Sequence, residues 1–185
     1  RENSRTMAVS APLLQLGIKG QPAEGGAAQL RQRLLGELAC EALAGNSSPL
    51  YNRLYEKGLI NSSFYLGYMD YPGCAFLVAG GETKDPEGVR DAILQEGKRI
   101  AEEGMEEAFF QRLKKAAYGA YVRGLNSFET LCVEQAQGYF AEQNPWTFPE
   151  IYDALTRQDV EEFLRVWIKP EQTSLIVIWP EEAGK

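Results

Sequence analysis

Residues 62–80 read SSFYLGYMDYPGCAFLVAG, which is two apolar runs on either side of a tight-turn signal. Pro72-Gly73 suits the centre of a type II turn, because proline presets the first central φ angle and glycine accepts a positive φ at the second. The pattern therefore predicts two strands, Ser62–Met69 and Cys74–Gly80, joined as a hairpin. Strands that come as a hairpin, rather than alternating with helices, favour an antiparallel sheet over a doubly wound one.

Two further strands are predicted near the two ends of the chain. In Met7–Lys19, apolar side chains alternate with polar or small ones from Leu14 to Ile18, as in a strand with one buried face. Thr173–Trp179 is β-branched and apolar for most of its length, which is typical of an interior strand. Residues 1–6 carry charge without an apolar stretch, so we expect a disordered leader there.

The remaining sequence predicts helices, each marked by a capping residue or by apolar residues at helical spacing. Gly45-Asn46 predicts a left-handed end to the first helix, and Asn126 with Glu129 predicts a capping box. The expected helices cover residues 30–43, 48–57, 85–103, 109–124, 126–139 and 156–167. The fold class that follows is α+β: a mainly antiparallel sheet with the helices packed on one face, in a single domain over residues 1–185.

The charge balance narrows the classes of partner. Lys and Arg number 19 against 26 Asp and Glu, which gives a net charge of −7. This balance argues against nucleic acid or an anionic membrane surface as the main partner. No apolar run approaches the roughly 20 residues of a membrane span, and there is no signal-peptide pattern. We therefore expect a cytoplasmic protein, with Cys40, Cys74 and Cys132 as reduced and buried thiols.

Histidine is absent, and this limits the chemistry more than any other count. Without imidazole there is no Ser-His-Asp or Cys-His arrangement and no histidine-based zinc site. The glycine-rich stretch 17–26 lacks the phosphate-loop signatures, so a strand-to-helix turn explains it better than nucleotide binding. The acidic run 102–107 is better explained as a solvated helix junction than as a carboxylate dyad or a calcium loop. We expect no catalytic residue and no metal ligand in this chain.

Three stretches occur in a distinctive order. Residues 35–61 read LGELACEALAGNSSPLYNRLYEKGLIN, a helix followed by G-x-S-S, L-Y-x-x-L and E-K-G-L. Residues 79–86, AGGETKDP, are a strand end and a helix cap. Residues 155–180 run from a T-x-x-D-V cap through Pro-Glu to an apolar strand that ends in proline. Together these stretches resemble the insulinase/pitrilysin family of zinc peptidases, and most closely the C-terminal half of bacterial subunits similar to the mitochondrial processing peptidase.

The resemblance implies a processing-peptidase-like metallohydrolase domain, duplicated within each subunit. In that family zinc is held by H-x-x-E-H and a distant Glu in the first half, where the motif's Glu activates water. This chain has no histidine, so it resembles the non-catalytic half, and zinc is expected in the missing N-terminal half. The implied partners are that sister half, a second peptidase-like subunit in a dimer, and a peptide substrate.

The resemblance also implies two candidate residues of the substrate chamber. In family halves that complete a partner's site, an Arg before E-K-G-L and a Tyr after it contact the substrate. The matching positions here are Tyr55 and Asn61. These side chains could stabilise a developing oxyanion only weakly. This half therefore resembles one that belongs to the zinc-bearing subunit.

The implied function is the scaffold and substrate-chamber half of a zinc-dependent endopeptidase subunit. One alternative is a catalytically inactive structural or adaptor subunit of the same fold, like the core proteins of respiratory complexes. Another is an unrelated binding module or an enzyme that uses paired carboxylates. A half that normally packs against a sister domain should expose an apolar surface. The tyrosine-rich region from Tyr51 to Tyr71 is the first candidate for that surface, although such tyrosines also form core edges.

Overall fold

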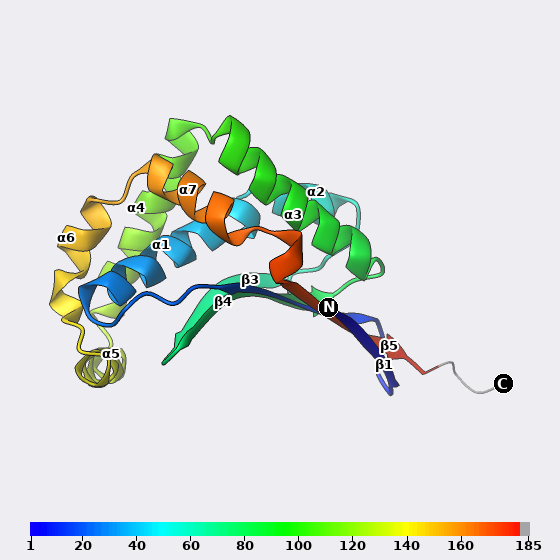
Figure 1. The fold of residues 1–185 in the computed structure, drawn as a ribbon, viewed down its shortest axis with the longest axis horizontal. Coiled ribbons are helices and arrows are strands. Elements are labelled where there is room, and N and C mark those ends of the chain that lie inside the picture. The colour runs from blue at the N-terminus through cyan, green and yellow to red at the C-terminus, as the bar shows by residue number, and fades with distance from the viewer. Residues whose placement is uncertain (182–185) are drawn as a thin grey trace.

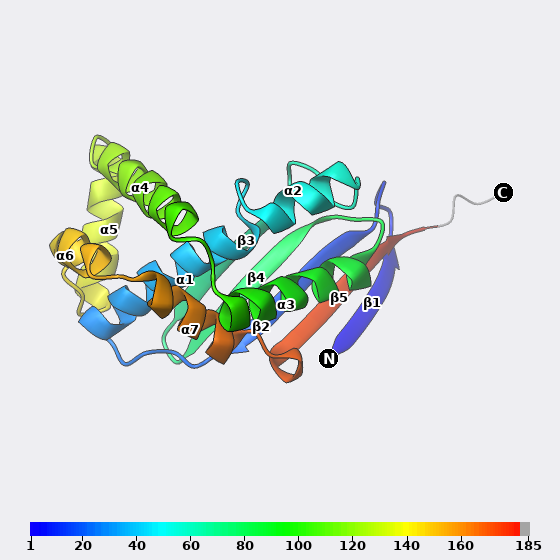
Figure 2. The ribbon, with the colours of Figure 1, turned by 90° about the horizontal axis from the view of Figure 1, so that it is seen from above.

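The computed structural model describes residues 1–181. It has one sheet with the strand order β1-β5-β2-β4-β3, and the helices cover one face of it (Figure 1, Figure 2). The strands are β1 (Glu2–Met7), β2 (Leu13–Gly20), β3 (Tyr65–Tyr71), β4 (Cys74–Glu82) and β5 (Thr173–Pro180). The helices are α1 (Ala27–Ala44), α2 (Pro49–Glu56), α3 (Pro86–Glu103), α4 (Glu107–Gly124), α5 (Phe128–Phe140), α6 (Phe148–Asp153) and α7 (Arg157–Trp167), with 3₁₀ turns η1 (Pro145–Thr147) and η2 (Pro170–Gln172).

The sheet confirms the predicted α+β class. β2 pairs with β4 and with β5, and β3 pairs with β4, in each case antiparallel. The four strands predicted from the sequence therefore share one sheet. β5, which was predicted to be interior, lies between β1 and β2. Within the described residues, no helix has both the length and the hydropathy needed to cross a membrane.

The N-terminal segment corrects the sequence-based expectation. Instead of a disordered leader over residues 1–6, Glu2–Met7 form β1, an edge strand that runs parallel to β5. The strand predicted from Met7 begins only at Leu13. All six residues of β1 are exposed, so their sequence shows no apolar alternation. β1 forms because its backbone hydrogen-bonds to the backbone of β5. The spacing of apolar residues along the sequence does not reveal this kind of pairing.

The core lies between the sheet and the helices. Leu14 and Leu16 of β2 point to this side and are at most 3% exposed. α1 crosses β3 so closely that a Cβ added at Gly36 would collide with the ring of Tyr68. The Tyr68 ring in turn meets Phe163 of α7 edge-on, with the ring centroids 6.3 Å apart. Tyr68 therefore joins the edge of the sheet to two helices.

Helix ends mostly follow the predicted chemistry, with two corrections. α5 is capped by the hydroxyl of Ser127, which accepts from the Thr130 N–H, rather than by Asn126. α1 ends at Gly45 in an extended conformation (φ −66°, ψ 160°) rather than a left-handed one. The chain must turn at once into α2, and the Gly45 carbonyl accepts from the Ser48 N–H. Three of the predicted helices, α2, α3 and α7, are N-capped by Ser48, Asp85 and Thr156.

α5 is the helix whose exposure departs most from expectation. Figure 1 shows it at the end of the molecule, lower than the other helices and level with the sheet. Gly138 is its one buried residue. Tyr139 is 80% exposed and Cys132 is also exposed, so the prediction of three buried thiols is wrong for Cys132. Cys74 is partly buried and Cys40 is buried, as expected of a core thiol.

Candidate functional site

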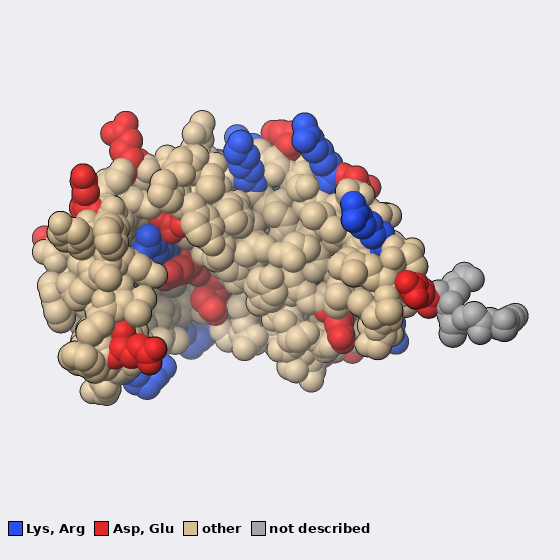
Figure 3. Space-filling view, turned by 90° about the horizontal axis from the view of Figure 1, so that it is seen from below, with Lys and Arg blue, Asp and Glu red and all other residues tan. Residues whose placement is uncertain are grey.

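The face of the sheet opposite the helices is open and apolar. Pairing aligns Tyr65, Gln15 and Ile176 in one row across the sheet, and directly paired residues point to the same face. Tyr65 and Ile176 are each 48% exposed. Figure 3, which views the molecule from this side, shows few charged side chains over the sheet. We call the apolar part of this surface the open sheet face; it consists of Leu13, Gln15, Tyr65, Met69, Tyr71, Phe76, Val78, Ile176 and Ile178. The strand register places the charged residues Lys19, Glu82 and Arg5 on the same side of the sheet.

Tyr55 lies on the solvent side of α2. The opposite side of this helix is apolar, and its Leu50 and Leu54 are buried, which fixes the rotation of the helix. The Tyr55 ring is 53% exposed and stacks on Tyr51, with the centroids 6.0 Å apart and the planes 11° from parallel. Tyr55 is thus a solvent-facing aromatic side chain on a fixed support.

Asn61 lies in the segment that leads into β3, and its amide group is already engaged. Its Nδ2 donates to the Glu82 carboxylate at 2.8 Å. Its Oδ1 accepts from the Ser63 backbone N–H at 2.9 Å and from the Ser63 hydroxyl at 2.6 Å. These bonds fasten the segment to the end of β4. The structure therefore gives the two sequence candidates different surroundings: Tyr55 faces solvent, and Asn61 holds a loop.

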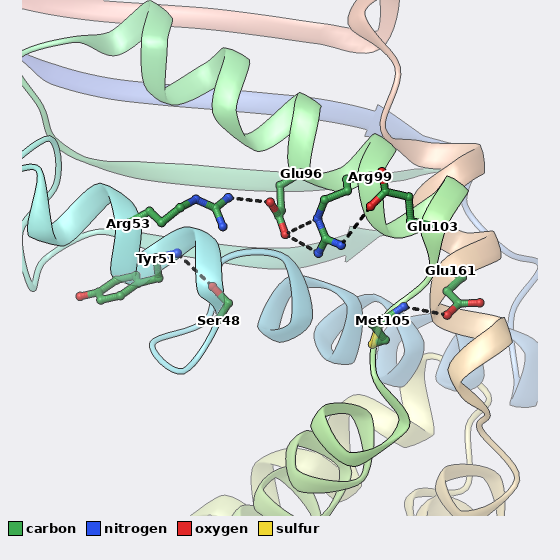
Figure 4. A network of polar contacts seen from close by, with 8 residues as sticks. All are labelled: Ser48, Tyr51, Arg53, Glu96, Arg99, Glu103, Met105 and Glu161. Atoms are coloured by element: carbon green, nitrogen blue, oxygen red, sulfur yellow. Dashed lines mark hydrogen bonds and ion pairs between the residues drawn. The ribbon is translucent and has the colours of Figure 1, made fainter.

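A buried carboxylate that the sequence analysis did not single out fixes α2 against α3. Glu96 is 4% exposed and accepts from Arg53 Nη2 of α2 at 2.6 Å and from Arg99 Nη2 at 2.7 Å (Figure 4). Burial alone would raise the pKa of Glu96, but the hydrogen bonds from Arg99 and Arg53 outweigh it and hold the pKa below its ordinary value. Arg53 and Glu96 are 43 residues apart, so no local spacing could have indicated the pair.

A cavity of about 790 Å³ opens beside β3, between α1, α4 and α5. Part of its wall is apolar and is formed by Leu34, Leu38 and Leu113. Figure 3 shows the recess at the left of the view, with charged side chains inside it. At its edge Asp70 accepts from both arms of the Arg33 guanidinium, from Nε at 3.0 Å and from Nη2 at 3.1 Å. Sequence analysis could not have found this cavity, because separate elements of the chain form its wall.

The side chains of this chain do not fit a zinc ion. No histidine occurs in the sequence, and among residues 1–181 no group of three or more Cys, Asp or Glu is arranged to hold a metal. Burial raises the pKa of the Cys40 thiol, which disfavours the thiolate that a metal would need. No step of zinc chemistry is therefore assigned to these residues.

Comparison with known proteins establishes the family. Residues 4–117, well over half of the chain, match the family described as "Peptidase M16 inactive domain". The chain belongs to this family. The match confirms the resemblance to the insulinase/pitrilysin zinc peptidases and to their non-catalytic half.

Relatives of this M16 inactive domain match it over nearly its whole length. The uncharacterized zinc protease YmfH of Bacillus subtilis is 27% identical over 186 residues, which cover 98% of this chain and 42% of that protein. A structure described as an M16-like peptidase from Alicyclobacillus acidocaldarius has a TM-score of 0.90 at 18% identity, covering 97% of this chain and 43% of the other. A structure of complex III2 from Candida albicans has a TM-score of 0.77 at 15% identity, with 96% and 45% covered. The chain thus spans less than half the length of these proteins, and the structural likenesses establish the fold.

Proposed function

We propose that this M16 inactive domain is the scaffold half of a zinc-dependent endopeptidase subunit, and that its open sheet face forms one wall of the substrate chamber. The observation that carries the proposal is the open sheet face itself. It is apolar and partly exposed, and it lies on the side of the sheet opposite the helices. Contiguous apolar patches of this kind mark interaction surfaces on soluble proteins. The name of YmfH, a zinc protease more than twice as long as this chain, supports a zinc-bearing half as the neighbour.

In this proposal the domain has three partners: a sister half, a second subunit and the peptide. The sister N-terminal half packs beside this domain and supplies zinc, and a second peptidase-like subunit closes the chamber. Tyr55 contributes an aromatic contact to the peptide, because it faces solvent on a rigid helix. Asn61 contributes by keeping the segment before β3 in place. The three free thiols fit a cytoplasmic location for the whole assembly.

The test uses the complete gene product in which this chain is joined to an H-x-x-E-H half. Ile176→Glu places a charge on the open sheet face, and Val166→Glu places one on the outer side of α7. The two residues are matched because each is 48% exposed. We expect kcat/KM for a peptide substrate to fall by about tenfold or more in Ile176→Glu, and by less than about twofold in Val166→Glu. Equal effects of the two substitutions would overturn the assignment of the open sheet face to the chamber.

A second candidate is a catalytically inactive structural or adaptor subunit of the same fold. The fold likeness to a chain of complex III2 is the observation that favours it. A gene product without an H-x-x-E-H half, found in a stable complex with other subunits and inactive on peptides, would select this candidate. Zinc-dependent cleavage by the complete gene product would exclude it.

A further inference from the structure

α5 presents an aromatic surface that the described part of the chain leaves uncovered. Phe128, Tyr139 and Phe140 are 82%, 80% and 84% exposed. Phe128 and Tyr139 are about three helical turns apart, so their rings lie on one stripe along the helix. The Phe140 ring meets that of Tyr139 edge-on, with the centroids 5.6 Å apart. We call this surface the α5 face; it consists of Phe128, Cys132, Val133, Gln135, Ala136, Tyr139 and Phe140.

The opposite side of α5 attaches the helix to the rest of the molecule. Glu134, Gln137 and Gly138 line the cavity between α1, α4 and α5. Gly138 packs on Pro145 so closely that an added Cβ would lie 2.6 Å from the proline ring. The direction of the α5 face is therefore fixed. Figure 1 and Figure 2 show α5 at the opposite end of the molecule from β1 and β5, so a partner on the α5 face leaves that end free.

The α5 face is complementary to a second copy of itself. Rings stand at both ends of the helix, and the smaller side chains of Cys132 and Gln135 lie between them. When two copies cross antiparallel, Phe128 of each copy meets Tyr139 of the other, and the same register sets Cys132 opposite Gln135. The two pairs share one midpoint along the helix, which is the condition that a two-fold axis imposes.

The charges at the two ends of α5 also match in this arrangement. Arg123, in the last turn of α4, lies near the start of α5, because a Cβ added at its neighbour Gly124 would be 4.0 Å from Thr130. Glu142 follows the end of α5. Both charged side chains are exposed, and neither forms a salt bridge within residues 1–181. An antiparallel pair brings Arg123 of each copy to the end where the other carries Glu142. Glu129 lies in the first turn, where the dipole of its own helix stabilises it.

The area of the α5 face is sufficient for a small specific interface. An aromatic side chain buries about 150–250 Å², so three rings that are 80–84% exposed offer roughly 500 Å² per copy. A pair would bury about 1,000 Å² in total, which is near the lower limit of specific interfaces. An anionic membrane is a poorer occupant, because α5 carries two glutamates and no basic residue.

We propose that the α5 face is a self-association surface, on which two copies of this chain pair through antiparallel α5 helices about a two-fold axis. The occupant is a second copy because shape, charge and area all match the same antiparallel register. This interface is separate from the open sheet face. It rests neither on zinc chemistry nor on the chamber proposed for that face, so either proposal can fail without the other.

Sedimentation velocity of the 185-residue chain between about 1 and 500 µM measures the association. We expect monomers at the low end and dimers at the high end. Tyr139→Glu should weaken the dimer by about tenfold or more, because it places a charge among the rings. Ile176→Glu is the control, since it places the same charge on the open sheet face, and it should leave the dimer unchanged. A chain that stays monomeric throughout, or a dimer that Tyr139→Glu does not weaken, would overturn the proposal.

The antiparallel register is tested with a cysteine that the chain already carries. Cys132 lies less than one turn from the proposed axis, so its Cα atoms in the two copies would be roughly 6 Å apart, within reach of a disulfide. Oxidation by diamide, which takes up two electrons and two protons from the thiols, should give a covalent dimer joined through Cys132. Below the dissociation constant the chain is monomeric and Cys132 is accessible to thiol reagents.

Tyr139→Glu is also the control for the cross-link, because it leaves the thiol of Cys132 in place on the helix. The yield of covalent dimer at one protein concentration should fall by about tenfold in this variant. Mass spectrometry of the digested dimer identifies the linked cysteines. Equal yields in the two proteins, or a dimer joined only through Cys74, would contradict pairing through the α5 face.

Discussion

At the scale of single residues, the polar contacts that fix this fold join positions far apart in the sequence. Glu96 of α3 forms a salt bridge with Arg53 of α2, and Arg33 of α1 forms one with Asp70 of β3. The Arg53 and Arg99 side chains are 51% and 42% exposed, whereas that of Glu96 is 5% exposed. The buried partner is therefore the one whose removal matters, because its desolvation is compensated only by the two guanidinium groups.

Glu96→Gln should lower the free energy of unfolding by about 1–3 kcal/mol, because a neutral amide replaces a buried carboxylate that accepts hydrogen bonds from two arginines. The partial exposure of both arginines keeps the loss below that of a fully buried pair. The pKa of Glu96 is below its ordinary value of 4.5 in the folded protein. Its contribution is therefore complete above pH 4.5 and is lost as the pH falls through the lowered pKa.

Urea denaturation at pH 7 and at lower pH measures both parts of this prediction. Glu102→Gln on the same helix is the control, since Glu102 and its partner Lys98 are both more than 60% exposed. It should change stability by less than about 0.5 kcal/mol. If the two variants were equally stable, the buried network would not be what holds α2 to α3.

Gly36→Ala should destabilise the protein by about 1–3 kcal/mol, because the added methyl group would overlap the Tyr68 ring where α1 crosses β3. Gly119→Ala in α4 is the matched control. There an added Cβ meets only the end of the Arg123 side chain, at 3.5 Å, so better helix propensity should stabilise by up to about 1 kcal/mol. Opposite signs in thermal or urea unfolding are the expected result, and a neutral Gly36→Ala would refute the close packing of α1 on β3.

At the scale of elements, the sequence predicted those strands and helices whose own residues carry a signal. The hairpin β3–β4, the interior strand β5 and the capped starts of α2, α3 and α7 were found in this way. β1 was missed because an exposed edge strand has no apolar face, and its pairing is decided by β5. The engagement of Asn61 was missed because its partner Glu82 is 21 residues away.

α5 shows the opposite error, because its Cys132 thiol was predicted to be buried and is exposed. Its exposed side chains include Phe128 at 82% and Phe140 at 84%. The tyrosine-rich region is divided in the same way: Tyr51 and Tyr68 belong to the core, while Tyr65 and Tyr71 lie on the open sheet face. Periodicity identifies the apolar side of an element, and only tertiary packing decides whether anything covers that side.

The reactivity of the cysteines tests whether α5 is exposed and α1 is buried. Cys132 on α5 is exposed and should react with a thiol reagent such as Ellman's reagent in the native protein. Cys40 on α1 is 2% exposed, and burial raises the pKa of its thiol. It should react only at the rate of unfolding. Mass spectrometry of partially modified protein gives the order in which the cysteines are modified. If Cys40 reacted before Cys132, this result would contradict the packing of α1.

At the scale of the whole molecule, the helices and the open sheet face divide the surface into two kinds. One side is a helical layer that buries the core, and the other presents the sheet directly to its surroundings (Figure 1, Figure 3). An apolar sheet face without a covering layer is uncommon in a protein that acts alone, since domains usually bury both faces of their layers or make the outer one polar. The open sheet face is therefore compatible with the similarity to YmfH, a protein more than twice as long as this chain.

The purified 185-residue chain should be inactive on peptides and should retain no stoichiometric zinc. The reason is that the described residues offer no group arranged to hold a metal, and the sequence has no imidazole. Metal analysis after dialysis and a peptide-cleavage assay with added zinc measure the two quantities. One zinc per chain, together with zinc-dependent cleavage, would contradict the assignment of this chain to the non-catalytic half.

The position of β5 has a consequence for the order of events during synthesis. β5 fills the place between β1 and β2, and the backbone nitrogen of Arg1 donates to the carbonyl of Thr173, 172 residues later. A ribosome that builds the chain from its N-terminus releases β2, β3 and β4 long before β5. Until residues 173–180 emerge, β2 presents a bare edge and β1 has no neighbour to pair with, which is a state prone to aggregation and slow to resolve. Of these five strands, the one translated last thus closes the sheet, and the one translated first is among the last to find its place.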